Sequence, residues 1–335
     1  MTILREISPA VPLGALIFST GKSLCLPFYH SIQGAEELLH IKHLYKLRTT
    51  EQFEKDIDYL LANFKAIDLD TLIEHILTGK PIDYPAFHIT FDDGLNEVYS
   101  IARPILNRKG VPSTTFLNSA FVDNKDLFFG YKASLIVEVL LQSENIDLDS
   151  VSCLLEIYSK NKSEIAENIL EIRYAERDVL DELASVLGVS FDAFLKKNKP
   201  YLTTAEINQM EREGHCFGAH SIDHPHFDDI DSQEQIRQII QSLRDIDNLT
   251  LRKTRSFSFP FSDAKVTKEV FEAIDTIHSD ILYFGTQGFK RDVQTNIAQR
   301  QWLEGTDIST SRVLKAEYLK YQLNIFRFAD QVKRN

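Results

Sequence analysis

Short apolar runs alternate with longer stretches of helical periodicity along most of the chain. This alternation is typical of an α/β fold with a mainly parallel sheet or barrel. Residues 50–64 show an amphipathic helical pattern after a threonine-rich start, which predicts a helix with a threonine cap. The expected strands are the short apolar runs at residues 24–29, 87–91, 114–117, 216–219, 256–259, 281–284 and 297–303.

Residues 125–200 depart from this alternation, because they hold helical patterns and no convincing strand. One helical face in this segment is apolar, and it consists of Ile165, Ile169, Ile172, Val179, Leu183 and Val186. We therefore expect one catalytic domain over residues 1–335 that carries a helical insertion at residues 125–200. Two interpretations of the insertion stay open: a packed decoration, or a wall or lid over a substrate site.

The net charge of the chain limits the classes of molecule that it is expected to bind. Its formal net charge is -12 and its pI is near 5.3, and no block of lysine and arginine stands out. Phosphate backbones attract basic surfaces, so we expect no nucleic-acid partner.

The cysteines and the apolar segments indicate a location. Cys25, Cys153 and Cys216 are few and odd in number, which does not suit a disulfide framework and favours a reducing compartment. Pro12 and Gly14 interrupt the first apolar stretch, and no continuous run is long enough to span a bilayer. We expect a cytoplasmic protein with no recognisable signal peptide and no membrane span.

Candidate chemistry begins where one of the expected strands ends. The apolar residues 87–91 run directly into Asp92, Asp93 and Gly94, and α/β enzymes place their sites at the carboxyl ends of strands. Alone, this pattern is weak, since Asp-Gly is also a common turn.

A pair of histidines follows another expected strand. His220 and His224 are four residues apart, a spacing that would bring two imidazoles together on one helical turn, where they can hold one ion. Alone, such a pair is more often an ordinary surface feature.

Together the two patterns predict a metal site with hydrolytic chemistry. One carboxylate and two imidazoles form a three-ligand zinc set that leaves a position open for water, whose pKa a metal can lower to about 7. Adjacent side chains of an extended stretch point in opposite directions, so Asp92 and Asp93 cannot easily bind the same ion. The carboxylate that is not a ligand can then accept the water's proton.

Residues 90–94 and 220–225 resemble the first two motifs of the polysaccharide deacetylases, carbohydrate esterase family 4, also called the NodB-homology family. The resemblance implies a distorted (β/α) barrel, with Asp92 as the catalytic base and with Asp93, His220 and His224 as metal ligands. It also implies a divalent metal, for which zinc fits the ligand set best, and a carbohydrate substrate. The backbone N–H of Phe261 is the implied oxyanion donor.

Two family features have no direct counterpart. Residues 257–262 resemble the third motif, but Ser258 stands where many members carry an arginine that steadies the base. Arg255 and Arg300 are the possible replacements, and we predict that Arg300 reaches Asp92, since it lies two residues before Trp302 on an expected strand and should share its face. The late Leu-x-His motif is absent after Trp302, so the general acid is unassigned, and His30 is the remaining candidate.

The expected function is metal-dependent hydrolysis of the N-acetyl group of an amino sugar or polysaccharide, with release of acetate. His30 and Trp302 are expected at the substrate site. Two alternatives stay open: an inactive metal-holding carbohydrate-binding protein, or a hydrolase of a non-peptide C–N bond in a small molecule.

Overall fold

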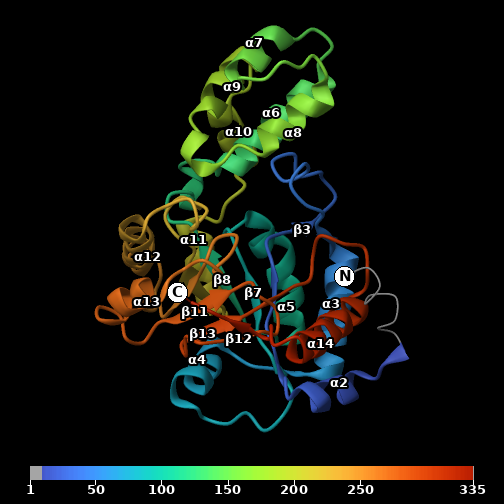
Figure 1. Ribbon diagram of the computed structural model, residues 1–335, viewed down its shortest axis with the longest axis vertical. Coiled ribbons are helices and arrows are strands. Elements are labelled where there is room, and N and C mark those ends of the chain that lie inside the picture. Colours follow the sequence, from blue (N-terminus) through green and yellow to red (C-terminus); the bar gives the residue numbers. More distant parts are fainter. Residues whose placement is uncertain (1–9, 335) are drawn as a thin grey trace.

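The computed structural model describes residues 10–334, and its centre is an eight-stranded parallel sheet that curls into a distorted barrel with helices around it (Figure 1). Every neighbouring pair in this sheet is parallel, as the alternating sequence pattern predicts. In spatial order the strands are β13 (Ile297–Gln299), β11 (Leu282–Gly285), β10 (Ser256–Ser258), β9 (Cys216–Ala219), β8 (Ser113–Leu117), β7 (Ile89–Phe91), β2 (Pro27–Tyr29) and β14 (Gln301–Trp302).

The two edges of this sheet are formed by one stretch of chain. β13 pairs with β11 and β14 pairs with β2, and only Arg300 separates them. The amide of Arg300 donates to the carbonyl of Gly285 (3.1 Å), and the next amide, that of Gln301, donates to the carbonyl of Leu26 (2.9 Å). The sequence predicts one strand at 297–303; the structure divides it, because the chain changes partner at Arg300.

Two other expected strands are divided for the same reason. Residues 24–29 form β1 (Leu24–Cys25) and β2, and residues 87–91 form β6 (Ala86–Phe87) and β7. β1 and β6 pair in a separate three-stranded sheet with β5 (Lys65–Ala66), whereas β2 and β7 belong to the barrel. Two short parallel pairs of strands complete the sheets: β3 (Ile32–Gln33) with β4 (Arg48–Thr49), and β12 (Arg291–Asp292) with β15 (Gln331–Val332).

Helices cover the outside of the barrel. The predicted helix at 50–64 is confirmed as α3 (Thr50–Asn63), and Thr49 begins it with a capping box: its hydroxyl accepts from the Gln52 amide at 3.2 Å, and the Gln52 side chain accepts from the Thr49 amide at 3.0 Å. The other barrel helices are α2 (Leu13–Thr20), α4 (Leu69–Thr78), α5 (Arg103–Lys109), α11 (Thr204–Arg212), α12 (Ser232–Asp247), α13 (Lys268–Asp275) and α14 (Thr310–Phe326).

The segment 125–200, called here the helical segment, projects from the barrel as a separate lobe (Figure 1). It contains α6 (Phe129–Gln142), α7 (Leu148–Leu154), α8 (Lys162–Leu170), α9 (Val179–Leu187) and α10 (Phe191–Asn198). Its apolar side chains form a core of their own, which continues into barrel residues such as Leu95 and Phe121. Its status as an insertion in a single domain over 1–335 stays a prediction, and residues 1–9 and 335 lie outside the described residues. Between residues 10 and 334, every helix is too short or too polar to cross a membrane.

Candidate active site

The three predicted ligands meet beyond the carboxyl ends of β7 and β9, the two strands that flank β8 in the barrel. Asp93 follows β7, while His220 follows β9 directly and His224 lies four residues further on. All three are buried, and one ligand atom from each lies within 4.8 Å of the others. The Asp93 Oδ1 atom is 3.5 Å from Nε2 of His220 and 3.2 Å from Nε2 of His224.

The two histidines converge through a loop, and the predicted helical turn is wrong. Ser221 and His224 both have positive φ (70° and 60°), a left-handed conformation that no helix contains. The Ser221 hydroxyl accepts a hydrogen bond from the His224 amide (3.0 Å), which closes the loop. The side chain of Asn118 donates to the carbonyl of His220 and so ties the loop to the strand beside it.

The atoms that face one another suit a cation. Nδ1 of His220 bonds to the Ser258 carbonyl (2.8 Å), which places the proton on Nδ1 and leaves Nε2 with a free lone pair. Burial lowers the pKa of His220 to about 4, so this ring is neutral at pH 7. Burial alone would raise the pKa of Asp93, but His224 and the other nearby imidazoles hold it below its ordinary value. Asp93 Oδ1 is buried and has no hydrogen-bond partner among residues 10–334, as expected of an atom that would bind a metal.

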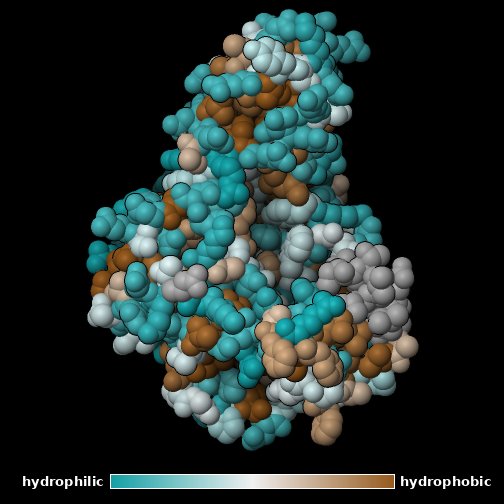
Figure 2. Space-filling view, viewed as in Figure 1, coloured by the Kyte–Doolittle hydropathy of each residue, from teal (hydrophilic) through white to brown (hydrophobic). Residues whose placement is uncertain are grey.

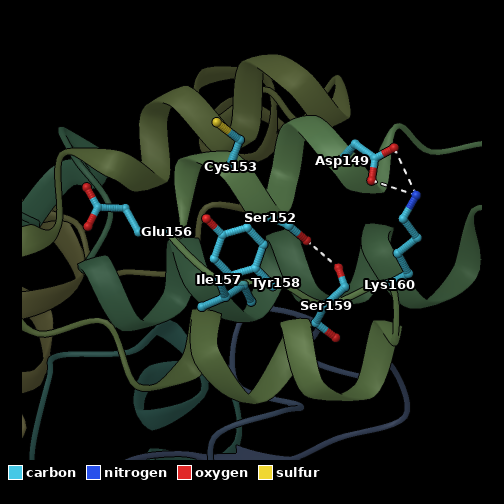
Figure 3. Close-up of a pocket in the computed structure, with 8 residues that line it drawn as sticks. All are labelled: Asp149, Ser152, Cys153, Glu156, Ile157, Tyr158, Ser159 and Lys160. Carbon is cyan, nitrogen blue, oxygen red and sulfur yellow. Dashed lines mark hydrogen bonds and ion pairs between the residues drawn. The ribbon is translucent and has the colours of Figure 1, made fainter.

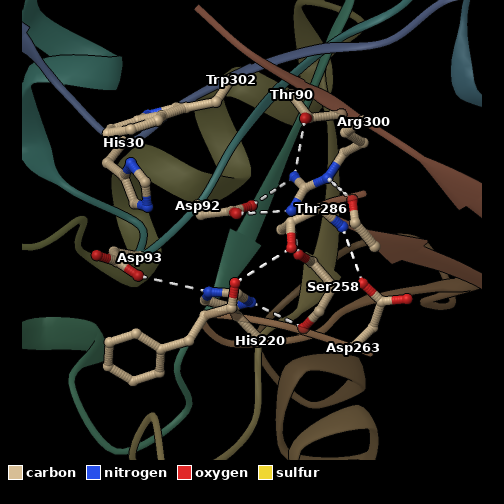
Figure 4. Close-up of polar contacts among 12 residues, drawn as sticks. His30, Thr90, Asp92, Asp93, His220, Ser258, Asp263, Thr286, Arg300 and Trp302 are labelled. Carbon is tan, nitrogen blue, oxygen red and sulfur yellow. Dashed lines mark hydrogen bonds and ion pairs between the residues drawn. The ribbon is translucent and has the colours of Figure 1, made fainter. Parts of the chain in front are cut away.

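The second carboxylate of the pair has a different partner. Both oxygens of Asp92 accept hydrogen bonds from the Arg300 guanidinium, each at 2.7 Å, and neither side chain is more than 3% exposed (Figure 4). The guanidinium also donates to the hydroxyls of Thr90 (3.0 Å) and Ser258 (2.6 Å), and it lies over the ring of Phe28 (4.4 Å). Burial alone would raise the pKa of Asp92, but Arg300 outweighs it and keeps the pKa below its ordinary value.

The predicted contact between Arg300 and Asp92 is therefore present, whereas the strand alternation expected to separate the two carboxylates is wrong. Asp93 is not extended, since its φ is 70°, so a turn rather than strand alternation separates the two carboxylates. Arg300 and Trp302 differ in exposure: Arg300 is fully buried, whereas Trp302 is 46% exposed. Arg255 forms ion pairs with Asp70 and Asp280, away from Asp92.

His30 lies at the same mouth and is bound to Glu304. Its Nδ1 contacts Glu304 Oε1, and its backbone amide donates to both carboxylate oxygens at 3.1 and 3.2 Å. The Trp302 indole N–H also donates to Glu304 (3.3 Å). Burial alone would lower the pKa of His30, but the Glu304 carboxylate raises it to about 9, so the ring is protonated at pH 7.

These groups open into a cavity of about 850 Å³ between the barrel and the helical segment, where the space-filling surface is hollowed (Figure 2). Phe261 lies on the loop after β10, has a φ of 53°, and stacks flat on His226 with ring centroids 3.5 Å apart. Phe261 and Trp302 are both about half exposed. The helical segment supplies one wall, made of residues 128–130 and 170–173.

A second cavity, of about 540 Å³, lies within the helical segment beside α7 (Figure 3). Its polar groups bind one another: Asp149 pairs with Lys160, and the Ser152 hydroxyl donates to the Ser159 carbonyl. Unlike the first cavity, its lining contains no histidine and no cluster that could hold a metal.

The carboxylate and histidine pattern is matched by a family model. The model that describes polysaccharide deacetylases matches residues 80–275, more than half of the 335 residues. The chain belongs to the polysaccharide deacetylase family. A comparison with curated proteins finds none that matches this deacetylase chain.

Solved deacetylases share the fold. The deacetylase PplD of Streptococcus pyogenes, in complex with acetate, is 11% identical, with a TM-score of 0.55 over 88% of this chain and 97% of that chain. A de-N-acetylase from Aggregatibacter actinomycetemcomitans is 12% identical, with a TM-score of 0.55 over 88% and 99%. IcaB from Ammonifex degensii is 13% identical, with a TM-score of 0.52 over 88% and 96%. At these identities the likeness shows the barrel fold of the deacetylases and no more.

Two residues of this deacetylase site escaped the sequence reasoning. Glu304 follows an expected strand and precedes Gly305, a position where an acidic residue usually faces solvent, so nothing marks it as the partner of His30. Tyr131 belongs to an apolar helical pattern and looks like an ordinary core residue, yet its hydroxyl donates to Asp93 Oδ2 at 2.6 Å.

Proposed function

We propose that this protein is a metal-dependent hydrolase that removes the N-acetyl group of an amino sugar or polysaccharide and releases acetate. The observation that carries the proposal is the pair of neighbouring carboxylates with separate partners. Asp93 faces His220 and His224, while Asp92 is bound by Arg300. One carboxylate is thus available to a metal and the other to a proton.

Asp93, His220 and His224 would hold a divalent ion, and zinc fits one carboxylate and two imidazoles best. The unpartnered Asp93 Oδ1 atom and the Nδ1–carbonyl bond of His220 support this role. When bound, such an ion supplies Lewis acidity toward the acetyl carbonyl and lowers the pKa of a reacting water.

Asp92 would accept the proton of the water that attacks the acetyl carbon. Arg300 holds both carboxylate oxygens, so it fixes the orientation of this base and compensates its charge in a buried site. The backbone N–H of Phe261 would donate to the carbonyl oxygen as negative charge develops on it.

His30 would donate the proton that the amine needs as the C–N bond breaks. Its contact with Glu304 and its raised pKa keep it protonated at pH 7, which is the state required of a general acid. This assignment gives the site a proton donor in the absence of the family's late Leu-x-His motif. Trp302, held by Glu304 and half exposed beside the cavity, would offer its ring to a sugar face.

The site also bears on the alternatives. The absence of the third-motif arginine and of the late histidine would favour the inactive binding protein, but Arg300 at Asp92 and His30 at Glu304 offer groups for both tasks. A small C–N substrate stays the second candidate, because the helical segment walls one side of a cavity whose volume suits a small ligand as well as a short oligosaccharide.

The test is acetate release by the metal-loaded protein from N-acetylglucosamine oligomers of increasing length, beside a panel of small N-acetyl compounds. The Asp92→Asn variant is the control for contaminating activity. We expect the wild type to release acetate from the oligomers and the Asp92→Asn variant not to do so. Release only from the small compounds would replace the carbohydrate substrate with the second candidate, and no release from either would reject the hydrolase.

A further inference from the structure

The helical segment contacts the candidate metal site directly through Tyr131. This residue lies in the first turn of α6, and its hydroxyl donates to Asp93 Oδ2 at 2.6 Å. Tyr131 is fully buried and Asp93 is 5% exposed, so water does not compete for this bond.

The bond gives the two oxygens of Asp93 different environments. Oδ2 has Tyr131 as its donor, whereas Oδ1 has no hydrogen-bond partner among residues 10–334 and faces the Nε2 atoms of His220 and His224. A carboxylate held in this way offers Oδ1 freely to an ion, whereas the Tyr131 bond occupies one lone pair of Oδ2 and so disfavours Oδ2 as a second ligand atom.

The tyrosine is itself held firmly by aromatic neighbours. Its ring makes edge contacts with Phe128 (4.9 Å) and His40 (5.1 Å), and the Phe128 ring in turn lies 4.5 Å from the ring of His224. The hydroxyl of Tyr201 accepts from the Phe128 amide (3.0 Å), which fixes the start of α6 beside the site. The same short stretch of the helical segment therefore packs against two of the three candidate ligands.

We propose that Tyr131 is a positioning residue that restricts Asp93 to a one-oxygen ligand, and that the helical segment is by this means a part of the metal site. The inference rests on the proposed function, because it assumes that Asp93, His220 and His224 hold a metal. Restricting Asp93 to one oxygen leaves more positions around the ion open for water and substrate.

The chain offers a matched control for this role. Tyr174, also in the helical segment, donates from its hydroxyl to Asp223 Oδ2 at 2.6 Å, a bond of the same kind and length to the same histidine loop. Asp223 lies outside the ligand set. Tyr174→Phe therefore removes an equivalent hydrogen bond between the helical segment and the barrel without changing a contact to a candidate ligand.

The experiment measures Zn²⁺ affinity by calorimetric titration of metal-free, full-length protein in the wild type, Tyr131→Phe and Tyr174→Phe. Loss of a group that orients a ligand typically weakens metal affinity by about 10- to 100-fold, and this is expected for Tyr131→Phe. Tyr174→Phe should bind as the wild type does. Wild-type affinity in Tyr131→Phe, or equal weakening in both variants, would overturn the inference while leaving the proposed function intact. A wild type that binds no metal would reject the proposed function itself.

A second measurement separates ligand geometry from general loosening. The visible absorption of bound Co²⁺ depends on its coordination number, so freeing Asp93 Oδ2 in Tyr131→Phe should change the spectrum, whereas Tyr174→Phe should keep that of the wild type. Identical spectra in all three proteins would contradict the one-oxygen restriction even if the affinities differed. Saturating Co²⁺ makes this readout independent of the affinity, and a thermal scan of each metal-free protein shows that it is folded.

Discussion

The guanidinium of Arg300 binds both oxygens of Asp92 at 2.7 Å although 208 positions separate the two residues in the chain. Arg300 occupies the break between β13 and β14, where the two edges of the barrel sheet meet. The closure of the barrel and the orientation of the proposed base thus depend on the same residue.

Replacing Arg300 with alanine should reduce acetate release strongly and leave the metal content unchanged. Removing one partner of a buried ion pair typically costs about 3–5 kcal/mol of stability, so the thermal unfolding temperature should also fall. Activity, metal content and unfolding are measured on the same preparation, below the unfolding transition. Arg255→Ala is the control and should behave as the wild type, because the Arg255 side chain is 39% exposed and pairs with Asp70 and Asp280, away from Asp92. Loss of metal together with activity would show that Arg300 supports the ligands instead of the base.

The division of roles between the two carboxylates predicts that isosteric variants of both lose activity but differ in metal content. Asp92→Asn should keep its metal and lose activity by about 10²- to 10⁴-fold, the usual contribution of a general base. Asp93→Asn should lose the metal and the activity together. Metal analysis after dialysis and acetate assays of both variants decide the question. Equal metal loss in the two would mean that the base and the ligand have been assigned wrongly.

The pH profile should report His30. A general acid must be protonated, and the pKa of His30 is raised to about 9, so activity should persist through neutral pH and decline as the pH rises through about 9. Glu304 is the main cause of the increase, with Asp92 and Asp93 adding to it. Glu304→Gln should therefore move the alkaline decline to lower pH. If activity declines at the same alkaline pH in Glu304→Gln as in the wild type, His30 is not the general acid.

Trp302 should matter for substrate binding more than for chemistry. Trp302 is 46% exposed, lines the cavity and donates from its indole N–H to Glu304. Trp302→Ala should raise KM for sugar oligomers while kcat changes less, because the lost contact with the sugar ring exists before and during the reaction. A fall in kcat at unchanged KM would place the indole in the chemical step, through its bond to Glu304.

The parts of the site that the sequence predicted are those that depend on strand ends. Asp92 and Asp93 follow an apolar run, and His220 follows another, so parallel strands bring them to one edge whatever the details of the loops. The barrel and its strand positions were predictable for the same reason.

The loop conformations were not predictable, because left-handed φ angles at Asp93, Ser221 and His224 leave no periodic pattern. The partners of Glu304 and Tyr131 were hidden for another reason. Each contact joins segments that are distant in the chain and depends on how the helical segment and the last barrel strand pack, which no local spacing encodes.

The central claim is that one metal ion at Asp93, His220 and His224 is required for deacetylation. The most direct test adds Zn²⁺ stepwise to metal-free protein and follows bound metal and acetate release from N-acetylglucosamine oligomers in the same samples, with His220→Ala in parallel. Activity should rise in proportion to bound metal and level off at about one ion per chain, the number that a single three-ligand site holds, while His220→Ala binds little metal and stays inactive. Full activity in the metal-free protein, or in His220→Ala, would contradict the account.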